Sequence, residues 1–385
     1  MSHAFDVDAF RAQFAALPRL AYFNSGSYGL LSGRVRDALG GYLATRDEKG
    51  ADWGAWVGAL EGMRDRMARL LRVDADEVAI TGSASAGINA IATGLDYSVR
   101  SKIVVSNFEF PTSGQIWHAQ EKAGARIVHI AESEDGLIPL ERFAAEIDED
   151  TAIVAISQVC YRNGGRIPDE DIKALSALAH AKGALLILDT YQIIGAAQIY
   201  PRDLGVDFCV GGTMKYLLGT AGIGFLYASP DALARVTPRT TGWFAQADID
   251  AMDIFHHTPS PSARRFEGGT PPVPNCVAAS AGLDVLLEAG LPAIEAQIAA
   301  MTALAIERLQ EEGIRLGSPV EPARRGPLLT IPVPDDQRLV DLLAQSDVVT
   351  SCRDGRVRAG FHAYNDIGDV ERLIEAVVAN RAVLV

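Results

Sequence analysis

Short apolar runs, separated by segments of helical periodicity, constrain the fold of this chain more than any other feature. The runs are rich in β-branched and aliphatic residues and are shorter than ordinary helices. They lie at residues 78–81, 103–106, 126–130, 152–157, 184–189, 207–212 and 222–227. Strands that are apolar on both sides are typical of a parallel sheet covered by helices on both faces. The pattern therefore predicts an α/β fold with a mainly parallel sheet.

The sequence pattern changes near residue 291. A length of 385 residues suits two domains, and residues 20–290, which hold the apolar runs, form the predicted large domain. The rest of the chain, 291–385, predicts a smaller α+β domain that residues 1–19 would join. Its expected elements are a long amphipathic helix, a strand near 328–333, a helix from Asp336, a strand through Val357 and a last helix from Gly368.

Charge and composition limit the partners. Lys and Arg number 35 against 49 Asp and Glu, for a net charge of −14, which opposes attraction to nucleic acid or to anionic membranes. No apolar run approaches the roughly 20 residues that span a bilayer, and the N-terminus lacks the pattern of a secretory signal. We therefore expect a cytoplasmic protein. The 4 cysteines and 7 histidines have no metal-binding spacing, so no metal site is predicted.

Polar residues at the ends of the apolar strands are the first candidates for chemistry, because ligands of open α/β sheets bind there. Asp189 ends the most apolar strand, although a helix-capping role would also explain it. Lys215 stands between two glycine-rich turns, where a solvated lysine is the ordinary alternative. Together they suit a covalent electron-sink cofactor, since the amine can form a Schiff base and the carboxylate can keep a ring nitrogen protonated.

A third motif suits a phosphate group. TGSASAGINA at residues 81–90 has small residues where a helix is predicted to begin, and backbone N–H groups at such a position favour an anion. An ordinary strand-to-helix turn with a serine cap is the alternative. The combination of the three motifs favours the cofactor.

These motifs, in this order, resemble fold-type I enzymes of the class V aminotransferase superfamily, which depend on pyridoxal 5′-phosphate (PLP). The superfamily includes cysteine desulfurases, selenocysteine lyases, isopenicillin N epimerase-like proteins and kynureninases. The similarity extends from YFNSGSYG at 22–29 to VRAGFHAYND at 357–366. The resemblance implies a large PLP-binding domain, PLP as the cofactor and an α-amino acid as the substrate.

The resemblance also implies roles for single residues. Lys215 matches the Schiff-base lysine, and Asp189 matches the acid that pairs with the ring nitrogen. Arg358 matches the arginine that binds the substrate carboxylate, although a solvated strand residue is the alternative and Arg353 and Arg356 could be confused with it. Further residues are implied at the cofactor: Gln192 at the ring hydroxyl, Ala84 and Ser85 at the phosphate, and Thr213, a cofactor-binding hydroxyl two residues before the lysine. Phe110 would stack on the ring, unless it is a core aromatic. The candidates for the substrate pocket are Ser27, Tyr28, Tyr161 and Arg162.

Two segments resemble those that reach the cofactor phosphate of a partner subunit in this superfamily. They are TGWF at 241–244 and RRFEGGTPP at 264–272, with Trp243 and Thr270 as the candidate residues. The resemblance implies a homodimer with shared active sites. Taken alone, the glycine- and proline-rich flanks would indicate a surface turn.

The reaction is less constrained than the cofactor. Desulfurases carry a mobile cysteine on a loop before the arginine motif, whereas here only TSCRDGRVR at 350–358 precedes it. We expect Cys352 to be a small buried residue in one strand that runs directly to Arg358. Transamination or elimination at Cβ is then expected, with desulfuration or selenocysteine lysis, kynureninase-like hydrolysis and epimerisation as alternatives. A non-catalytic PLP-fold binding module is the alternative of another class, and retention of both Lys215 and Asp189 argues against it.

Overall fold

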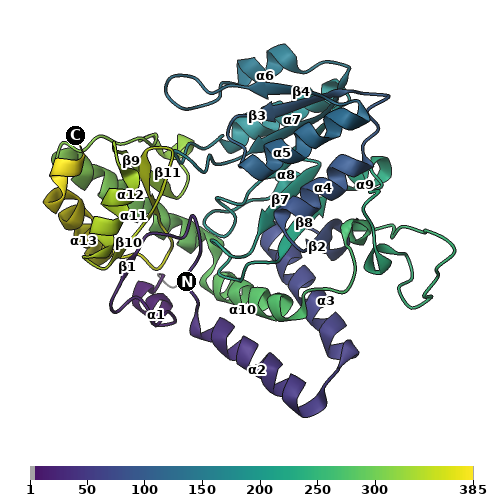
Figure 1. Cartoon of the computed structure of the whole chain (residues 1–385), viewed down its shortest axis with the longest axis horizontal. Coiled ribbons are helices and arrows are strands. Elements are labelled where there is room, and N and C mark those ends of the chain that lie inside the picture. Colours follow the sequence, from purple (N-terminus) through teal and green to yellow (C-terminus); the bar gives the residue numbers. More distant parts are fainter. Residues whose placement is uncertain (1–4, 385) are drawn as a thin grey trace.

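The computed structural model describes residues 5–384; residues 1–4, which belong to the predicted N-terminal segment, and residue 385 lie outside it. Its main feature is a seven-stranded sheet with the order β2-β8-β7-β6-β5-β3-β4 (Figure 1). Strand β8 runs antiparallel to both of its neighbours, β2 and β7, and all other neighbouring strands in this sheet are parallel. The strands are β2 (Val78–Thr81), β3 (Lys102–Ser106), β4 (Arg126–Ile130), β5 (Thr151–Ser157), β6 (Leu185–Asp189), β7 (Phe208–Gly212) and β8 (Gly224–Ala228).

Alternate residues of these strands face two separate apolar cores. Ile103 and Val105 of β3 belong to the core on one face, while Val104 belongs to the core on the other. Burial on both faces is the reason why the runs are mostly apolar, except in the edge strand β4, where Arg126 and His129 are exposed. The predicted α/β fold is confirmed. The helices of this part are α2 (Gly33–Lys49), α3 (Trp53–Leu71), α4 (Ala84–Gly94), α5 (Pro111–Ala119), α6 (Leu140–Glu146), α7 (Asp169–Ala181), α8 (Pro201–Leu204), α9 (Pro230–Arg235) and α10 (Val273–Ala289).

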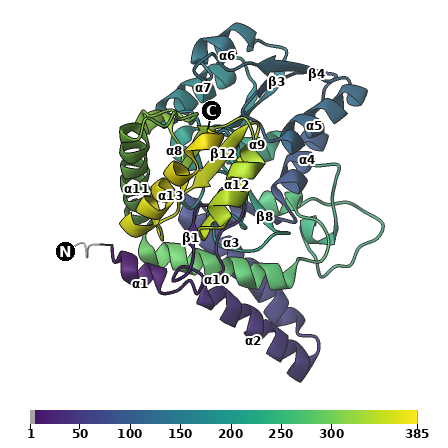
Figure 2. The same cartoon turned by 60° about the vertical axis from the view of Figure 1, so that its left-hand side comes forward.

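The C-terminal part forms a smaller body beside the sheet, in which α11 and α13 lie side by side (Figure 2). Its three-stranded antiparallel sheet has the order β11-β12-β9. The elements are α11 (Leu291–Glu311), β9 (Leu328–Pro332), α12 (Asp336–Ala344), β10 (Val348–Val349), β11 (Ser351–Arg353), β12 (Arg356–Gly360) and α13 (Ile367–Ala379). Short 3-10 turns lie at Ala75–Glu77, Gln120–Ala123, Trp243–Ala245, Ala263–Phe266, Pro322–Arg324 and Arg381–Val383.

The described N-terminal residues pack on this smaller body. Strand β1 (Ala21–Tyr22) pairs in parallel with β10. Arg11, the last residue of α1 (Val7–Arg11), forms ion pairs with Asp366 at 3.0 Å and Asp369 at 2.6 Å. These contacts support joining the N-terminal segment to the C-terminal body, while the boundary at residue 291 stays a prediction.

One local expectation is wrong. The segment that precedes Arg358 is not a single strand but a hairpin, because Asp354 and Gly355 adopt positive φ values of 56° and 68° and turn the chain between β11 and β12. Asp-Gly is a strong hairpin signal. Cys352 in β11 is also partly exposed rather than buried, because β11 is an edge strand of its sheet.

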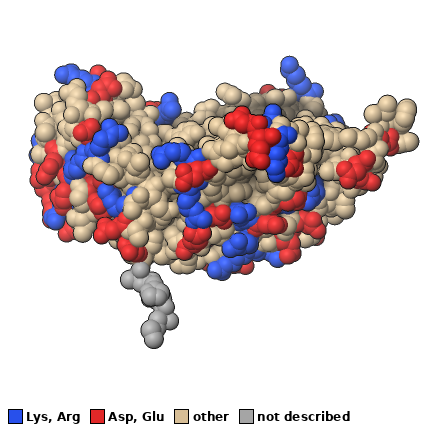
Figure 3. All heavy atoms as spheres, turned by 90° about the horizontal axis from the view of Figure 1, so that it is seen from below, with Lys and Arg blue, Asp and Glu red and all other residues tan. Residues whose placement is uncertain are grey.

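The surface carries mixed charge. On the face shown in Figure 3, acidic and basic side chains alternate without a continuous basic area. Among the described residues no single helix has the length and apolar composition to cross a membrane, and only α10 and α11 taken together, bent by 81°, meet that test.

Candidate active site

A cavity of about 230 Å³ lies at the carboxyl ends of the sheet strands and gathers half of the predicted residues. Lys215 and Asp189 both line it, the lysine from the loop after β7 and the aspartate from the end of β6. Their meeting at this edge is what the parallel strand order requires. The other lining residues are Ser83, Ala84, Ser85, Ile88, Phe108, Phe110, Thr112, Ser157, Val159, Tyr161, Tyr191, Gln192 and Met214.

Lys215 is a buried amine between two aromatic rings. Its side-chain Nζ lies 4.4 Å from the ring centre of Tyr191 and 5.9 Å from that of Phe110. Burial lowers the pKa of Lys215 to about 8, with a smaller contribution from the positive charges of Arg358 and Arg353 and against the attraction of Asp189. An amine with this pKa can hold or release a proton near neutral pH.

Asp189 is held by the turn that follows its strand. Its Oδ1 accepts a hydrogen bond of 2.8 Å from the backbone N–H of Tyr191, and burial raises its pKa. The residues that follow form a turn rather than a helix, so the helix-capping alternative is wrong and a local turn contact takes its place. This contact leaves Oδ2 available to a group in the cavity.

The first turn of α4 provides backbone N–H groups at the cavity wall. Ser83 caps the helix by accepting from Ala86 N at 3.1 Å, and no acidic residue lies in the first turn. Gly224 permits this approach, since a Cβ there would lie 2.9 Å from the backbone N of Ala84. Ala84 and Ser85 are therefore placed as a phosphate site requires.

Gln192 lines the same cavity and carries a buried, unsatisfied side-chain oxygen. Its Nε2 donates to the carbonyl of Gly26 at 3.2 Å, while Oε1 is buried without a partner among the described residues. A buried unpaired polar atom is costly unless a ligand satisfies it. Together with the flanking rings, the helix start and the buried carboxylate, this oxygen makes the cavity fit a flat, phosphate-bearing pyridine such as PLP.

Arg358 of β12 is fully enclosed beside the cavity, with 3% of its surface exposed. Its guanidinium donates to the carbonyl of Tyr161 at 2.7 Å and to the hydroxyls of Ser27 at 2.9 Å and Ser351 at 3.1 Å. The Nε atom is buried without a hydrogen-bond partner within residues 5–384, and no carboxylate pairs with the group in that range. Burial and the charge of Arg353 lower the pKa of Arg358. An unneutralised, buried guanidinium suits a substrate carboxylate.

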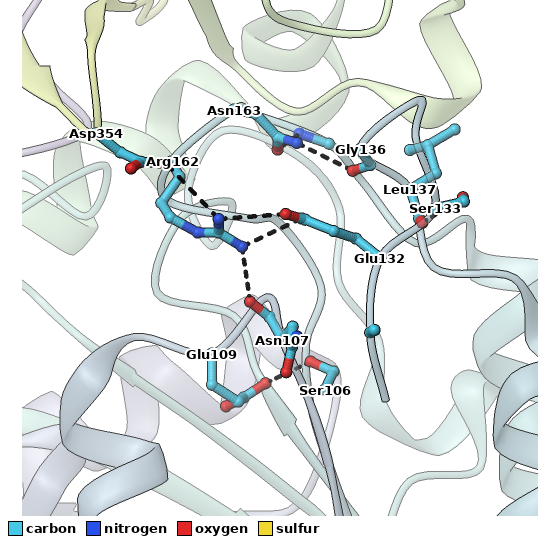
Figure 4. Close-up of polar contacts among 12 residues, drawn as sticks. Ser106, Asn107, Glu109, Glu132, Ser133, Gly136, Leu137, Arg162, Asn163 and Asp354 are labelled. Carbon is cyan, nitrogen blue, oxygen red and sulfur yellow. Dashed lines mark hydrogen bonds and ion pairs between the residues drawn. The ribbon is translucent and has the colours of Figure 1, made fainter. Parts of the chain in front are cut away.

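The loop that carries Tyr161 is fastened from outside the cavity (Figure 4). The guanidinium of Arg162 forms two hydrogen bonds with Glu132, at 3.2 and 3.1 Å, and one of 2.9 Å with the carbonyl of Asn107. It also lies 3.7 Å from Asp354, at the hairpin turn. Tyr161 thus lines the cavity, whereas Arg162 points away from it and links three loops.

The remaining predicted residues lie outside the cavity lining. The hydroxyl of Thr213 donates to the carbonyl of Thr220 at 2.9 Å, and the hydroxyl of Tyr28 accepts from Ala221 N at 3.2 Å. Trp243 packs edge-on against Trp53 at 6.0 Å, and Thr270 is exposed. Their roles toward cofactor or substrate stay predictions.

Two residues that were not among the predicted ones bear on the chemistry of the site: Tyr191, which lines the cavity, and Glu109, whose carboxyl group feels the charge of Asp189. Tyr191 forms the second aromatic wall, and its position between Asp189 and Gln192 in the sequence was the signal. Glu109 lies directly before Phe110, and its carboxylate accepts from Ser106 Oγ at 2.9 Å (Figure 4). Burial and the charge of Asp189 raise the pKa of Glu109 to about 7.

Comparison with known proteins gives a consistent family. The family model described as "Aminotransferase class-V" matches residues 54–373. An uncharacterized aminotransferase YcbU of Bacillus subtilis (strain 168) is 28% identical over 372 residues, which cover 97% of each chain. A kynureninase of Deinococcus radiodurans is 30% identical over 392 residues, covering 96% of this chain and 92% of that protein. The apo structure of a cysteine desulfurase from Thermococcus onnurineus NA1 superposes with a TM-score of 0.87 at 21% identity, covering 100% and 99% of the two chains, and shares the fold.

Proposed function

The chain belongs to the aminotransferase class-V family, and on that premise we propose that it transforms an α-amino acid by transamination or by elimination at Cβ. As a member it is a PLP-dependent enzyme of fold type I. The observation that carries the proposal is the buried amine of Lys215, with a pKa of about 8, in one cavity with Asp189 and Gln192.

Each residue of the site would have its own role toward the cofactor or the substrate. When bound, PLP withdraws electrons from Cα of the amino acid and weakens the bonds there. Asp189 would hold a proton on the ring nitrogen, and Phe110 and Tyr191 would flank the ring. Arg358 would bind the α-carboxylate and so orient Cα toward Lys215. The amine of Lys215 would attach the resting cofactor and then take up and return the Cα proton at Nζ.

The cysteines do not support desulfuration through a protein persulfide. Cys352 turns its Sγ away from the cavity, toward Gln337 Oε1 of α12 at 3.5 Å, because it alternates with Ser351, which contacts Arg358. The other three, Cys160, Cys209 and Cys276, are buried, and burial raises the pKa of each. Cys352 is partly exposed, but burial and the neighbouring Asp336 raise the pKa of its thiol. None of the four therefore offers the exposed thiolate of low pKa, directed at the cavity, that sulfur transfer needs. Kynureninase-like hydrolysis is the second candidate, favoured by the 30% identical relative and by Phe110 before Pro111.

We also propose that the active unit is a homodimer. Trp243 and Thr270 do not line the cavity of their own chain, as residues that serve a partner's site would not. Large apolar side chains are exposed in the neighbouring segment, where Ile254 and Phe255 are 85% and 83% exposed, and at Trp53, 48% exposed. An apolar surface of this kind is typical of a subunit interface.

Covalent labelling tests the role of Lys215. Borohydride should fix PLP on this residue, so the peptide that contains Lys215 should gain the cofactor's mass. Lys215→Ala should retain PLP through the other contacts yet lose turnover by about a thousand-fold or more, measured as keto acid, ammonia and sulfide released from a panel of amino acids. Lys173→Ala, which removes an exposed lysine paired with Glu170, is the matched control. Full turnover in Lys215→Ala would contradict the proposal.

A further inference from the structure

A second hollow, of about 330 Å³, lies between α11 and the sheet-bearing part of the chain. One wall comes from α11, another from residues 322–327, and the rest from the turn after β6 and from the loop that follows Tyr161. The lining residues are Arg166, Ile193, Ala196, Ala197, Glu295, Ile298, Ala299, Thr302, Pro322, Ala323, Arg325, Gly326 and Pro327. A ligand there would contact both parts of the molecule.

Arg325 is the unusual member of this lining. Only 7% of its surface is exposed, yet its guanidinium has no ion pair within residues 5–384. Its Nη1 donates to the carbonyl of Val320 at 2.5 Å, and burial lowers its pKa. The preceding Arg324, by contrast, lies near Asp171 at 3.7 Å and Glu321 at 3.8 Å. Buried arginines are ordinarily paired with an acid, so Arg325 lacks a partner that its burial calls for.

The backbone holds Arg325 rigidly in place. The N–H of Arg166 donates to the carbonyl of Arg324 at 2.8 Å, and the N–H of Gly326 donates to that of Gly164 at 2.9 Å. These bonds tie the segment antiparallel to the loop that carries Tyr161. They hold the backbone of this segment at the edge of the hollow that Arg325 lines.

The other charged groups around the hollow are already engaged. Arg166 pairs with Asp169 at 2.8 Å, although its Nε is buried without a partner among the described residues. Glu295 accepts from the backbone N and the Nε2 of Gln198, at 3.3 and 3.1 Å. An adjoining hollow of about 470 Å³ shares Arg325; of its two acidic residues, Glu311 pairs with Arg308 at 2.9 Å, and Glu307 does not reach Arg325.

We propose that this hollow is a binding site, separate from the active site, for a small molecule with a carboxylate or phosphate group, which Arg325 holds. The planar fork of a guanidinium matches both anions, and desolvation strengthens the contact. The volume suits a metabolite-sized ligand. Both contacts from Gln198 go to Oε2 of Glu295. Its Oε1 could therefore accept a hydrogen bond from a donor at the other end of the ligand.

Thermal unfolding of the PLP-loaded protein in three salts tests the site. Inorganic phosphate and malonate are compared with chloride at equal ionic strength and pH. Binding to the folded state should raise the unfolding midpoint by about 3 °C or more over chloride at saturation. A rise with phosphate alone assigns a phosphate ligand, and a rise with malonate alone assigns a carboxylate. A midpoint that is the same in all three salts overturns the proposal.

Variants assign the response to the hollow. Arg325→Gln should lose the shift, while Arg324→Gln, the neighbouring arginine, should keep it. Arg358→Gln should also keep it, which separates the hollow from the carboxylate site beside Lys215. Arg325→Lys retains the charge without the fork and should weaken binding about tenfold, so it serves if the glutamine variant does not fold. An unchanged shift in both Arg325 variants overturns the assignment.

Discussion

Glu109 places a second titrating carboxyl group beside the one that the cofactor is expected to use. It is mostly buried, it accepts from Ser106, and it feels the charge of Asp189. With a pKa near 7, Glu109 holds a proton in slightly acidic solution and loses it in slightly basic solution. Its ionisation would add negative charge next to Asp189 and so change the environment of the ring nitrogen at physiological pH.

The raised pKa of Glu109 predicts a defined pH dependence of stability. The pKa rises from 4.5 to about 7 on folding, so between these values the folded state keeps a proton that the unfolded state releases. The free energy of unfolding should therefore fall as pH rises through this window, by on the order of 2–3 kcal/mol from this group. Glu109→Gln should remove the loss, as measured by urea unfolding of the cofactor-free protein at several pH values.

The control for this measurement is Glu134→Gln, which replaces an exposed glutamate. It should follow the parent curve across the same pH range, because its exposed side chain loses little hydration on folding. A parent and a Glu109→Gln variant with parallel curves between pH 4.5 and 7 would show that Glu109 ionises normally in the folded protein.

Motifs in the sequence, together with the family resemblance, were enough to predict residues that lie near the carboxyl ends of the strands. Asp189, Gln192, Lys215, Ala84 and Ser85 were each tied to a motif, and all five line one cavity.

Side-chain direction was not predictable in the same way. A Cβ on Gly212 would lie 2.1 Å from the hydroxyl of Tyr191, so the place of this ring depends on a glycine in a neighbouring strand. The alternation of strand residues gives no direction for a side chain in the turn after β6. The sequence therefore placed Tyr191 near the site but did not predict that its ring forms the second aromatic wall of the cavity.

At the scale of the element, the hairpin of β11 and β12 separates two chemistries that lie close in the sequence. Ser351 is opposite Arg358, and Cys352 is opposite Val357. Successive strand residues point to opposite faces. The face with Ser351 and Arg358 therefore lies toward the cavity, while the face with Cys352 and Val357 packs toward α12. The Asp-Gly turn sets the pairing of β11 with β12. Once this turn is recognised in the sequence, the face to which Cys352 points follows from its position in the strand.

Substitutions on the two faces should have opposite outcomes. Arg358→Ala should lower catalytic efficiency about 30-fold or more, because it removes a charge-assisted contact from a buried site. Cys352→Ser should leave turnover within about twofold, since its side chain contacts Gln337 and not the cavity. Steady-state rates with each active amino acid measure both effects.

Arg356→Gln is the matched arginine control on the same strand, because Arg356 pairs with Asp354 at 2.8 Å in the hairpin turn. It should retain most of the activity. Loss of sulfide release from cysteine in Cys352→Ser, with PLP still bound, would instead restore desulfuration as the reaction.

At the scale of the molecule, the active site depends on contacts that sequence patterns do not reveal. The N-terminal segment reaches the site because Gly29 N donates to the carbonyl of Met214 at 2.8 Å, and a Cβ on Gly29 would lie 2.2 Å from the carbonyl oxygen of Lys215. The same segment joins the small body, where Phe23 N donates to Val349 O at 2.8 Å. Apolar periodicity predicts the strands of the large sheet, but it predicts neither the short strands β1, β10 and β11 nor these long-range pairings, since it carries no information on order within a sheet.

If the active unit is a homodimer with shared sites, two inactive variants should restore activity when they are mixed. If Thr270 completes the partner's cofactor site, Lys215→Ala and Thr270→Ala proteins should each be inactive or impaired alone. A mixed dimer then holds one site with both changes and one with neither. After subunit exchange at equal concentrations, half of the dimers are mixed, so activity should recover to about a quarter of the parent value.

Subunit exchange has a control within the same chain. Mixing Lys215→Ala with Lys215→Ala,Thr270→Ala leaves every site without its lysine, so no activity should return although dimers exchange equally well. Gel filtration with light scattering at the assay concentration gives the oligomeric state directly. An active monomer would mean that Trp243 and Thr270 do not serve a partner's site, and that the exposed side chains of Ile254 and Phe255 are not covered by a second copy. Mixing that restores nothing, when exchange is demonstrated by mass, would mean that Thr270 does not complete the partner's site.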